Sequence, residues 1–154
     1  MIIKHVPTPY LLPCFLIVFS VAVFLPIGAH AATQVSGIIA SSTTWTLNQS
    51  PYVVEVPRGA SLVIVEQGAT LTIEPGVIVK FGLQGKLIVQ GVLDVQATEG
   101  APIIFTSIFD DAAGGDTNGD GNASAQFPGA WFDVTFEEGS TGIFSHSTIR
   151  YAGQ

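Results

Sequence analysis

Residues 68–81 read GATLTIEPGVIVKF, and this stretch decides the fold class. It holds two short runs of aliphatic and β-branched residues, 70–73 and 77–81, on either side of a Glu-Pro-Gly turn. Runs of this kind, bounded by Gly or Pro, predict β-strands. Because successive side chains of a strand point to opposite faces, the pattern separates an inward set from an outward set. The inward set is Leu71, Ile73, Val77, Val79 and Phe81, and the outward set is Thr70, Thr72 and Lys80.

Similar short runs recur along the chain, at 61–65, 86–89, 92–95 and 103–106. Comparable triplets lie 22, 24 or 25 residues apart, where Leu71 matches Leu93, Val79 matches Ile103 and Leu62 matches Leu87. Spacings in the twenties predict an all-β solenoid with three short strands in each coil. A competing match of Leu71 with Leu87 leaves the register open, and a small β-sandwich is the alternative fold.

Several of these segments resemble those of a known family. They are TWTL at 44–47, SPYVV at 50–54, GATLTIEPGVIVKF at 68–81, PIIFTS at 102–107 and TIRYAG at 148–153. Together they are similar to coils of secreted bacterial right-handed parallel β-helix proteins of the pectate-lyase-like kind, over about residues 42–153. The resemblance implies a right-handed parallel β-helix in an exported or surface protein. Many such proteins are adhesins or surface modules, and some cleave polysaccharides.

The first 31 residues have the parts of a secretory signal peptide. Lys4 begins a weakly basic start, residues 11–25 are nearly all apolar, and Ala29-His30-Ala31 forms an A-x-A end. This pattern predicts cleavage after Ala31 and a secreted or cell-surface product with no membrane segment. A retained membrane anchor is the alternative, although the apolar run is shorter than the ~20 residues that cross a bilayer. Cleavage would remove Cys14, so the mature chain would have no disulfide.

The remaining residues divide into two parts in this reading. Residues 32–60 are expected to form a lead-in or cap, and residues 61–154 to form about three to four coils with a Gly/Asp-rich loop at 107–130. The chain stops at Gln154 just after a strand-like segment, which predicts an incomplete C-terminal end and a fragment of a longer protein. An open last coil exposes unpaired backbone, so self-association through that coil is a further expectation.

The charge balance limits the partners. Five Lys and Arg against twelve Asp and Glu give a net charge of −7. A net acidic surface without a basic stripe argues against nucleic-acid binding. A polysaccharide or another cell-surface ligand remains the expected partner.

The loop at 107–130 carries a candidate metal site. Asp116, Asn118 and Asp120, followed by Gly121, fit the front half of a calcium loop, in which oxygen ligands alternate and Gly permits a sharp turn. Phe127 stands where the usual bidentate Glu would be, so Asp110 or Asp111 would have to supply a further carboxylate. The pattern predicts weak calcium binding, and the alternative is a solvated acidic loop that binds no ion.

No catalytic residues are assigned. Asp133 and Glu137 would share a face only if one strand ran through both, and the Glu138-Gly139 pair predicts its end. His146 has no orienting acid and is expected to be an exposed strand residue. The sequence is therefore compatible with two functions. The first is a non-catalytic exported surface or adhesive module, stiffened by calcium. The alternative is a polysaccharide-active lyase or glycoside hydrolase whose catalytic coils lie mostly beyond residue 154, with Arg150 and the Asp loop posed for a lyase.

Overall fold

The computed structural model describes residues 31–55 and 61–153. They form short parallel strands in three sheets. Sheet A has the order β1-β4-β7-β10-β13, sheet B the order β11-β8-β5-β2 and sheet C the order β12-β9-β6-β3. The predicted signal peptide lies outside the described residues, except for Ala31.

The strands follow one another around the three sheets. Their bounds are β1 (Thr33–Val35), β2 (Gly37–Ile39), β3 (Thr43–Trp45), β4 (Tyr52–Val54), β5 (Leu62–Val65), β6 (Thr70–Ile73), β7 (Ile78–Phe81), β8 (Lys86–Val89), β9 (Val92–Val95), β10 (Ile103–Ser107), β11 (Asp133–Phe136), β12 (Thr141–Ile143) and β13 (Ser147–Ile149). A single 3₁₀ turn in the described chain, η1 (Leu47–Gln49), precedes β4. Four consecutive sets of three strands therefore stack in the described chain, and β13 adds a fifth strand to sheet A.

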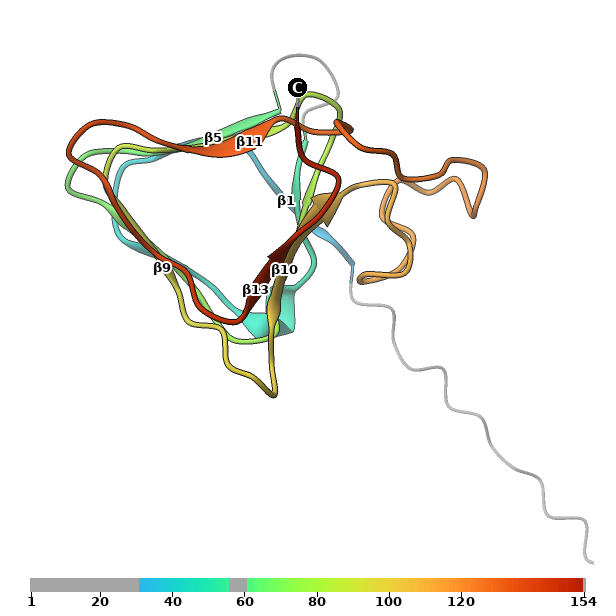
Figure 1. The fold of residues 1–154 in the computed structure, drawn as a ribbon, viewed down its shortest axis with the longest axis horizontal. Coiled ribbons are helices and arrows are strands. Elements are labelled where there is room, and N and C mark those ends of the chain that lie inside the picture. The colour runs from blue at the N-terminus through green and yellow to red at the C-terminus, as the bar shows by residue number, and fades with distance from the viewer. Residues whose placement is uncertain (1–30, 56–60, 154) are drawn as a thin grey trace, which may run out of the picture.

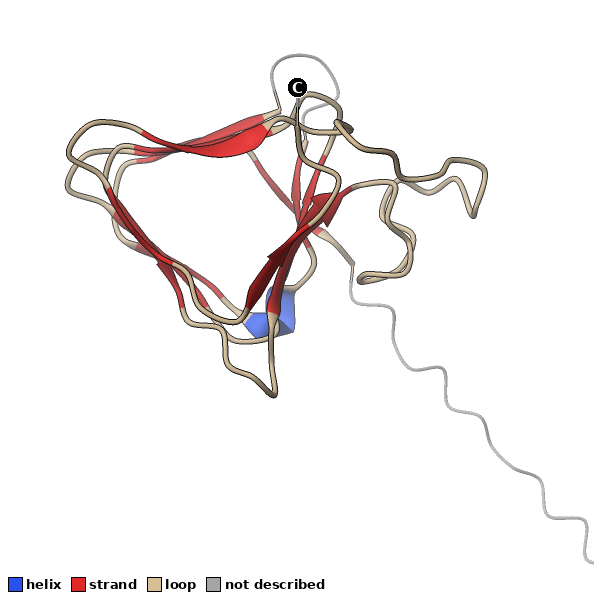
Figure 2. Cartoon of the chain, in the orientation of Figure 1, coloured by secondary structure: helices blue, strands red, loops and turns tan. Residues whose placement is uncertain are grey.

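This arrangement is a parallel β-helix, as the sequence predicted. Figure 1 looks along the coil axis, and the chain passes from β10 to β11 and on toward β13 around a triangular outline. Figure 2 shows that strands make up its three sides and that loops form the corners. Right-handed crossovers are the rule for parallel strands in one sheet, and the coils turn in that sense.

The core is a stack of aliphatic rungs inside the triangle. Every side chain predicted to point inward between Leu71 and Phe81 is fully buried, and these residues belong to one apolar cluster. Its later members are Leu87, Val89, Leu93, Val95, Ile103 and Phe105. Each fully buried aliphatic side chain contributes ~1.5–3 kcal/mol relative to an exposed one. Two stacked ring pairs join neighbouring coils within the core, Trp45 on Tyr52 at 4.8 Å and Phe81 on Trp131 at 4.2 Å between centroids.

The register confirms one predicted repeat and corrects two. Leu71 pairs with Leu93, as expected. Leu87, however, pairs with Val63 rather than Leu62, because Val63 and Val65 are the buried members of that strand. Val79 pairs with Phe105 rather than Ile103. The competing match of Leu71 with Leu87 is wrong, since β6 and β8 lie in different sheets.

The segment expected to be a lead-in is already part of the coil. Residues 33–35, 37–39 and 43–45 form β1, β2 and β3, which pair with β4, β5 and β6. The described part of 32–60 therefore supplies one complete set of strands and begins the next with β4. The prediction missed it because these strands are only three residues long and carry few inward aliphatic side chains.

Candidate functional site

Among the connections that the structure describes in full, the one between β10 and β11 departs most from the regular solenoid. Residues 82–85 make the equivalent connection in the preceding coil, whereas residues 108–132 make it here. The longer connection leaves the strand pairing intact, because β10 still pairs with β7 and β11 with β8. The loop extends outside the triangular outline next to sheet A (Figure 1).

Lys80 lies beneath this loop. The sequence predicted that Lys80 faces outward, and its neighbours Val79 and Phe81 do occupy the core. Lys80 is nevertheless 0% exposed. Its Nζ donates a hydrogen bond to the Gly115 carbonyl at 2.5 Å. Val53, Lys80 and Thr106 form one row on the outer face of sheet A. Their side chains point away from the core of the coil and are nevertheless buried.

Three carboxylates of the loop influence the charge state of this ammonium group. Burial lowers the pKa of Lys80 because it removes water from the charged form, and Asp111, Asp110 and Asp116 oppose this effect by their negative charge. These are three of the five residues predicted to bind calcium. In the structure their negative charge favours the charged form of a buried lysine side chain.

Asp110 also fixes the loop to this row on the outer face of sheet A. It is 1% exposed, and its Oδ2 accepts a hydrogen bond from the Thr106 hydroxyl at 2.7 Å. The same oxygen lies 3.6 Å from Nη1 of Arg150, which follows β13. Asp111 Oδ1 is buried without a hydrogen-bond partner. The Thr106 contact is local, four residues along the chain, and was not predicted, whereas the Arg150 contact joins the two groups that the lyase alternative placed together.

Asp116, Asn118 and Asp120 form a separate tight turn at the tip of the loop. The two oxygens of Asp116 accept hydrogen bonds from the amides of Gly119 at 2.7 Å and Gly121 at 2.8 Å. The bond from Gly121 is the largest cause that lowers the pKa of Asp116. Asp120 likewise accepts hydrogen bonds from the amides of Ala123 and Ser124.

The predicted calcium ligands thus do not converge as a set. Asp110 and Asp111 lie at the sheet, whereas the carboxylates of Asp116 and Asp120 are occupied by backbone amides of their own turn. Within the part of the chain that the structure describes, no three His, Cys, Asp or Glu side chains are grouped so that they could hold a metal ion. Calcium binding by this loop therefore stays a prediction.

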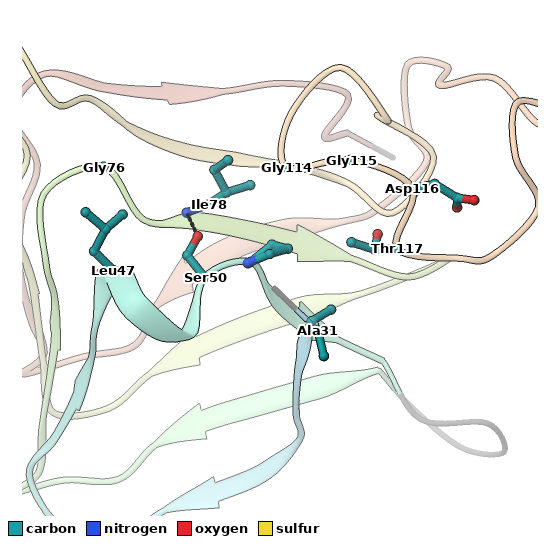
Figure 3. Close-up of a pocket in the computed structure, with 11 residues that line it drawn as sticks. Ala31, Leu47, Ser50, Gly76, Ile78, Gly114, Gly115, Asp116 and Thr117 are labelled. Atoms are coloured by element: carbon teal, nitrogen blue, oxygen red, sulfur yellow. Dashed lines mark hydrogen bonds between the residues drawn. The ribbon is translucent and has the colours of Figure 1, made fainter. Parts of the chain in front are cut away.

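A groove lies where the loop meets the sheet A side of the first three coils. It has a volume of about 600 Å³ and is lined by Ala31, Ala32, Leu47, Ser50, Pro51, Gly76, Ile78 and residues 114–117 (Figure 3). Ser50 lies on its wall, and the Ser50 hydroxyl accepts a hydrogen bond from the Ile78 amide at 2.9 Å. A Cβ atom on Gly114 would lie 3.3 Å from side-chain atoms of Pro51 and Ile78. The loop therefore packs closely enough to fix this wall of the groove.

The carboxylates considered for hydrolysis lie apart from this groove. Asp133 pairs with Lys86 at 3.3 Å on sheet B, and Glu137 accepts a hydrogen bond from Gln90. The strand β11 ends at Phe136, as the Glu-Gly pair predicted. His146 is exposed but lies in a bend before β13, with a φ of 45°, so the expectation of a strand residue is wrong.

Comparisons with known proteins found no match. No family model matches the chain, and no curated protein or solved structure matches it. Within residues 31–55 and 61–153, no helix is both long and apolar enough to cross a membrane.

Proposed function

We propose that this chain is an exported, non-catalytic surface module of the pectate-lyase-like β-helix kind, which binds a polysaccharide or another cell-surface ligand. The observation that carries the proposal is the loop at 107–130. It is held on sheet A by Lys80 and Asp110 and forms one wall of a groove on an otherwise regular solenoid. Ordered loops on a rigid scaffold are where binding residues concentrate. The signal-like start of the sequence supports export.

Ligand binding is tested with the mature chain, residues 32–154, on immobilised polysaccharides. Thr117→Trp places a large ring at the groove and should abolish retention. Thr141→Trp places the same ring on the exposed strand β12 and should leave retention unchanged. If both variants bind like the unmodified chain, the groove is not the binding site. If none of the proteins is retained on any polysaccharide, the ligand class is wrong.

Export is tested independently by the intact mass of the product released from cells. The proposal expects a chain that starts at Ala32. A product that keeps residues 1–31 would contradict it.

The enzyme alternative is favoured by one contact. Arg150 lies next to Asp110 of the loop. The lyase alternative requires a cation beside the acidic loop, and this contact supplies it. Incubation with acidic polysaccharides should release unsaturated or reducing ends if this alternative holds. The proposal made here expects no release by the pure, folded chain.

Calcium stiffening is part of the same proposal and has its own test. Binding would be weak, at ~0.1–1 mM as in extracellular modules. Calorimetry should show heat that is lost in the Asp120→Asn variant. The absence of heat at millimolar calcium, on a chain shown to be folded, would contradict it.

A further inference from the structure

Two segments of the chain match the acceptor pattern for N-linked glycosylation, which is Asn-x-Ser or Asn-x-Thr with any residue but Pro in the middle. They are Asn48-Gln49-Ser50 beside the groove and Asn122-Ala123-Ser124 in the loop. The pattern is short and occurs by chance, so the surroundings of each asparagine decide whether a transferase can use it. A glycan is bulky and hydrophilic, so its acceptor must reach solvent.

Asn48 is held in place by its surroundings. The side-chain oxygen of Asn48 accepts a hydrogen bond from the Thr46 hydroxyl. The Ser50 hydroxyl, which a transferase must recognise, accepts a hydrogen bond from the Ile78 amide of β7 at 2.9 Å (Figure 3). Because a transferase binds its acceptor as an extended peptide, its use of Asn48 would break the contact between this segment and β7.

Asn122 is not held in this way. Residues 119–123 are all exposed. Every hydrogen bond that the structure gives to residues 118–124 ends within residues 116–124, so none of these bonds joins the turn to a strand. Local opening of this turn would therefore leave the stacked coils intact. The structure thus makes Asn122 the accessible acceptor of the two.

The residues before each asparagine give a second distinction. Bacterial oligosaccharyltransferases also bind a carboxylate two positions before the asparagine, and pairing with a guanidinium group is the strong form of such a contact. Asp120 stands at this position before Asn122 and is exposed. Thr46 stands at the same position before Asn48. The longer acceptor pattern is therefore complete only at Asn122.

We propose that Asn122 is an N-glycosylation site, to which a transferase moves an oligosaccharide from a lipid-linked oligosaccharyl diphosphate. The Asn122 side-chain nitrogen attacks C1 of the first sugar and forms a C–N bond. The C1–O bond breaks, its electron pair leaves with the lipid diphosphate, and one amide proton passes to a base of the transferase. The reaction takes place outside the cytoplasm, so the inference rests on the export in the proposed function. The glycan would be carried by the loop that forms one wall of the groove.

The experiment incubates the folded mature chain with a purified bacterial oligosaccharyltransferase and a synthetic lipid-linked oligosaccharyl diphosphate. Intact mass measures the transfer, and peptide mass mapping locates it. We expect one glycan on Asn122 and none on Asn48. Purified components need no export, so a failure of this reaction is distinct from a failure of export, which the mass of the released product tests.

Matched variants test the recognition of each position. Ser124→Ala removes the hydroxyl and should abolish the gain in mass, whereas Ser124→Thr should retain it. Asp120→Asn removes the carboxylate and should abolish the gain, whereas Asp120→Glu should retain it. Asn48→Gln should be glycosylated like the unmodified chain.

The controls make a negative result decisive. A standard acceptor peptide shows that the transferase is active. A folded chain that then gains no mass would overturn the inference, and a synthetic peptide of residues 118–126 shows why. If the peptide is glycosylated, the folded turn withholds Asn122, and if it is not, the segment is no acceptor. A gain in mass that persists in Asn122→Gln would overturn the inference as well, because the glycan would then lie elsewhere.

Discussion

Lys80 shows how a side chain can follow the strand pattern and still end in an unexpected environment. Alternation along β7 decides correctly that Lys80 points out of the coil, because its neighbours fill the core. Its burial comes from the loop, which begins 28 residues later in the sequence. Nothing local to 77–81 could have shown this, since burial of an outward residue depends on what the next coil carries.

The buried lysine makes stability depend on pH. Its pKa in the folded chain lies below the ordinary 10.5. Between these two values the unfolded chain binds more protons than the folded chain, so the free energy of unfolding rises with pH through that interval. In Lys80→Met this rise should be smaller, whereas Lys86→Met on the surface should retain it. Denaturant titrations at several pH values below 10.5 measure the slopes. Equal slopes for the unmodified chain and Lys80→Met would contradict the assignment.

Adjacent residues of β8 test the inward assignment. Leu87 is fully buried, whereas Ile88 points outward and is partly exposed. Leu87→Asp would bury an unpaired charge and should destabilise the chain by about 3–5 kcal/mol. Ile88→Asp should fold with a much smaller loss. Thermal unfolding followed by circular dichroism compares the two, and a Leu87→Asp variant that melts like the unmodified chain would be inconsistent with this core.

At the scale of the strands, the sequence predicted their existence better than their pairing. The number of residues that separates two paired positions in the sequence is set by the lengths of the corners. It differs between sheets, as the pairs Leu71–Leu93 and Val79–Phe105 show. Runs such as Leu62–Val65 are aliphatic on both faces, so alternation cannot tell which face is buried. The register there is decided by packing against the neighbouring coil, where Val63 meets Leu87.

The turn between β8 and β9 fits closely against the coil below it. A Cβ on Gly91 would lie 2.3 Å from the carbonyl oxygens of Glu66 and Ala69, which are backbone atoms that cannot move aside. Gly91→Ala should therefore cost about 1–3 kcal/mol of stability, as overpacking typically does. Gly100→Ala has no atom within 4 Å of the added Cβ and is the matched control. Urea unfolding of both variants measures the difference, and equal stabilities would contradict the described stacking.

At the scale of the whole molecule, the repeats in the sequence predicted the fold. They did not predict the candidate site. The fold follows from aliphatic residues that recur at each coil, and this information lies in every segment. The site depends on contacts between segments far apart, such as Asp110 with Arg150. The predicted calcium ligands identified the correct loop, because Asp and Gly mark a long turn, but not the lysine that the loop covers.

The last described coil exposes apolar side chains. Ile143 is 56% and Ile149 52% exposed, at the uncovered edges of β12 and β13. Unpaired strand edges with apolar side chains favour association, so a protein consisting of residues 32–154 alone is expected to form concentration-dependent oligomers. Ile143→Lys together with Ile149→Lys should shift it toward the monomer in light scattering. The same two changes should leave the melting temperature nearly unaltered, and a variant that still associates would exclude this edge as the contact.

The connection between β10 and β11 has a consequence for engineering. A corner that holds residues 108–132 leaves the strands on either side in the same register as the corner that holds residues 82–85. The number of residues in this corner can therefore change without changing the register of the strands. A foreign peptide inserted at this corner, or at the equivalent corner of another coil, would be displayed on the side of the solenoid. The choice of coil would set its position along the solenoid axis.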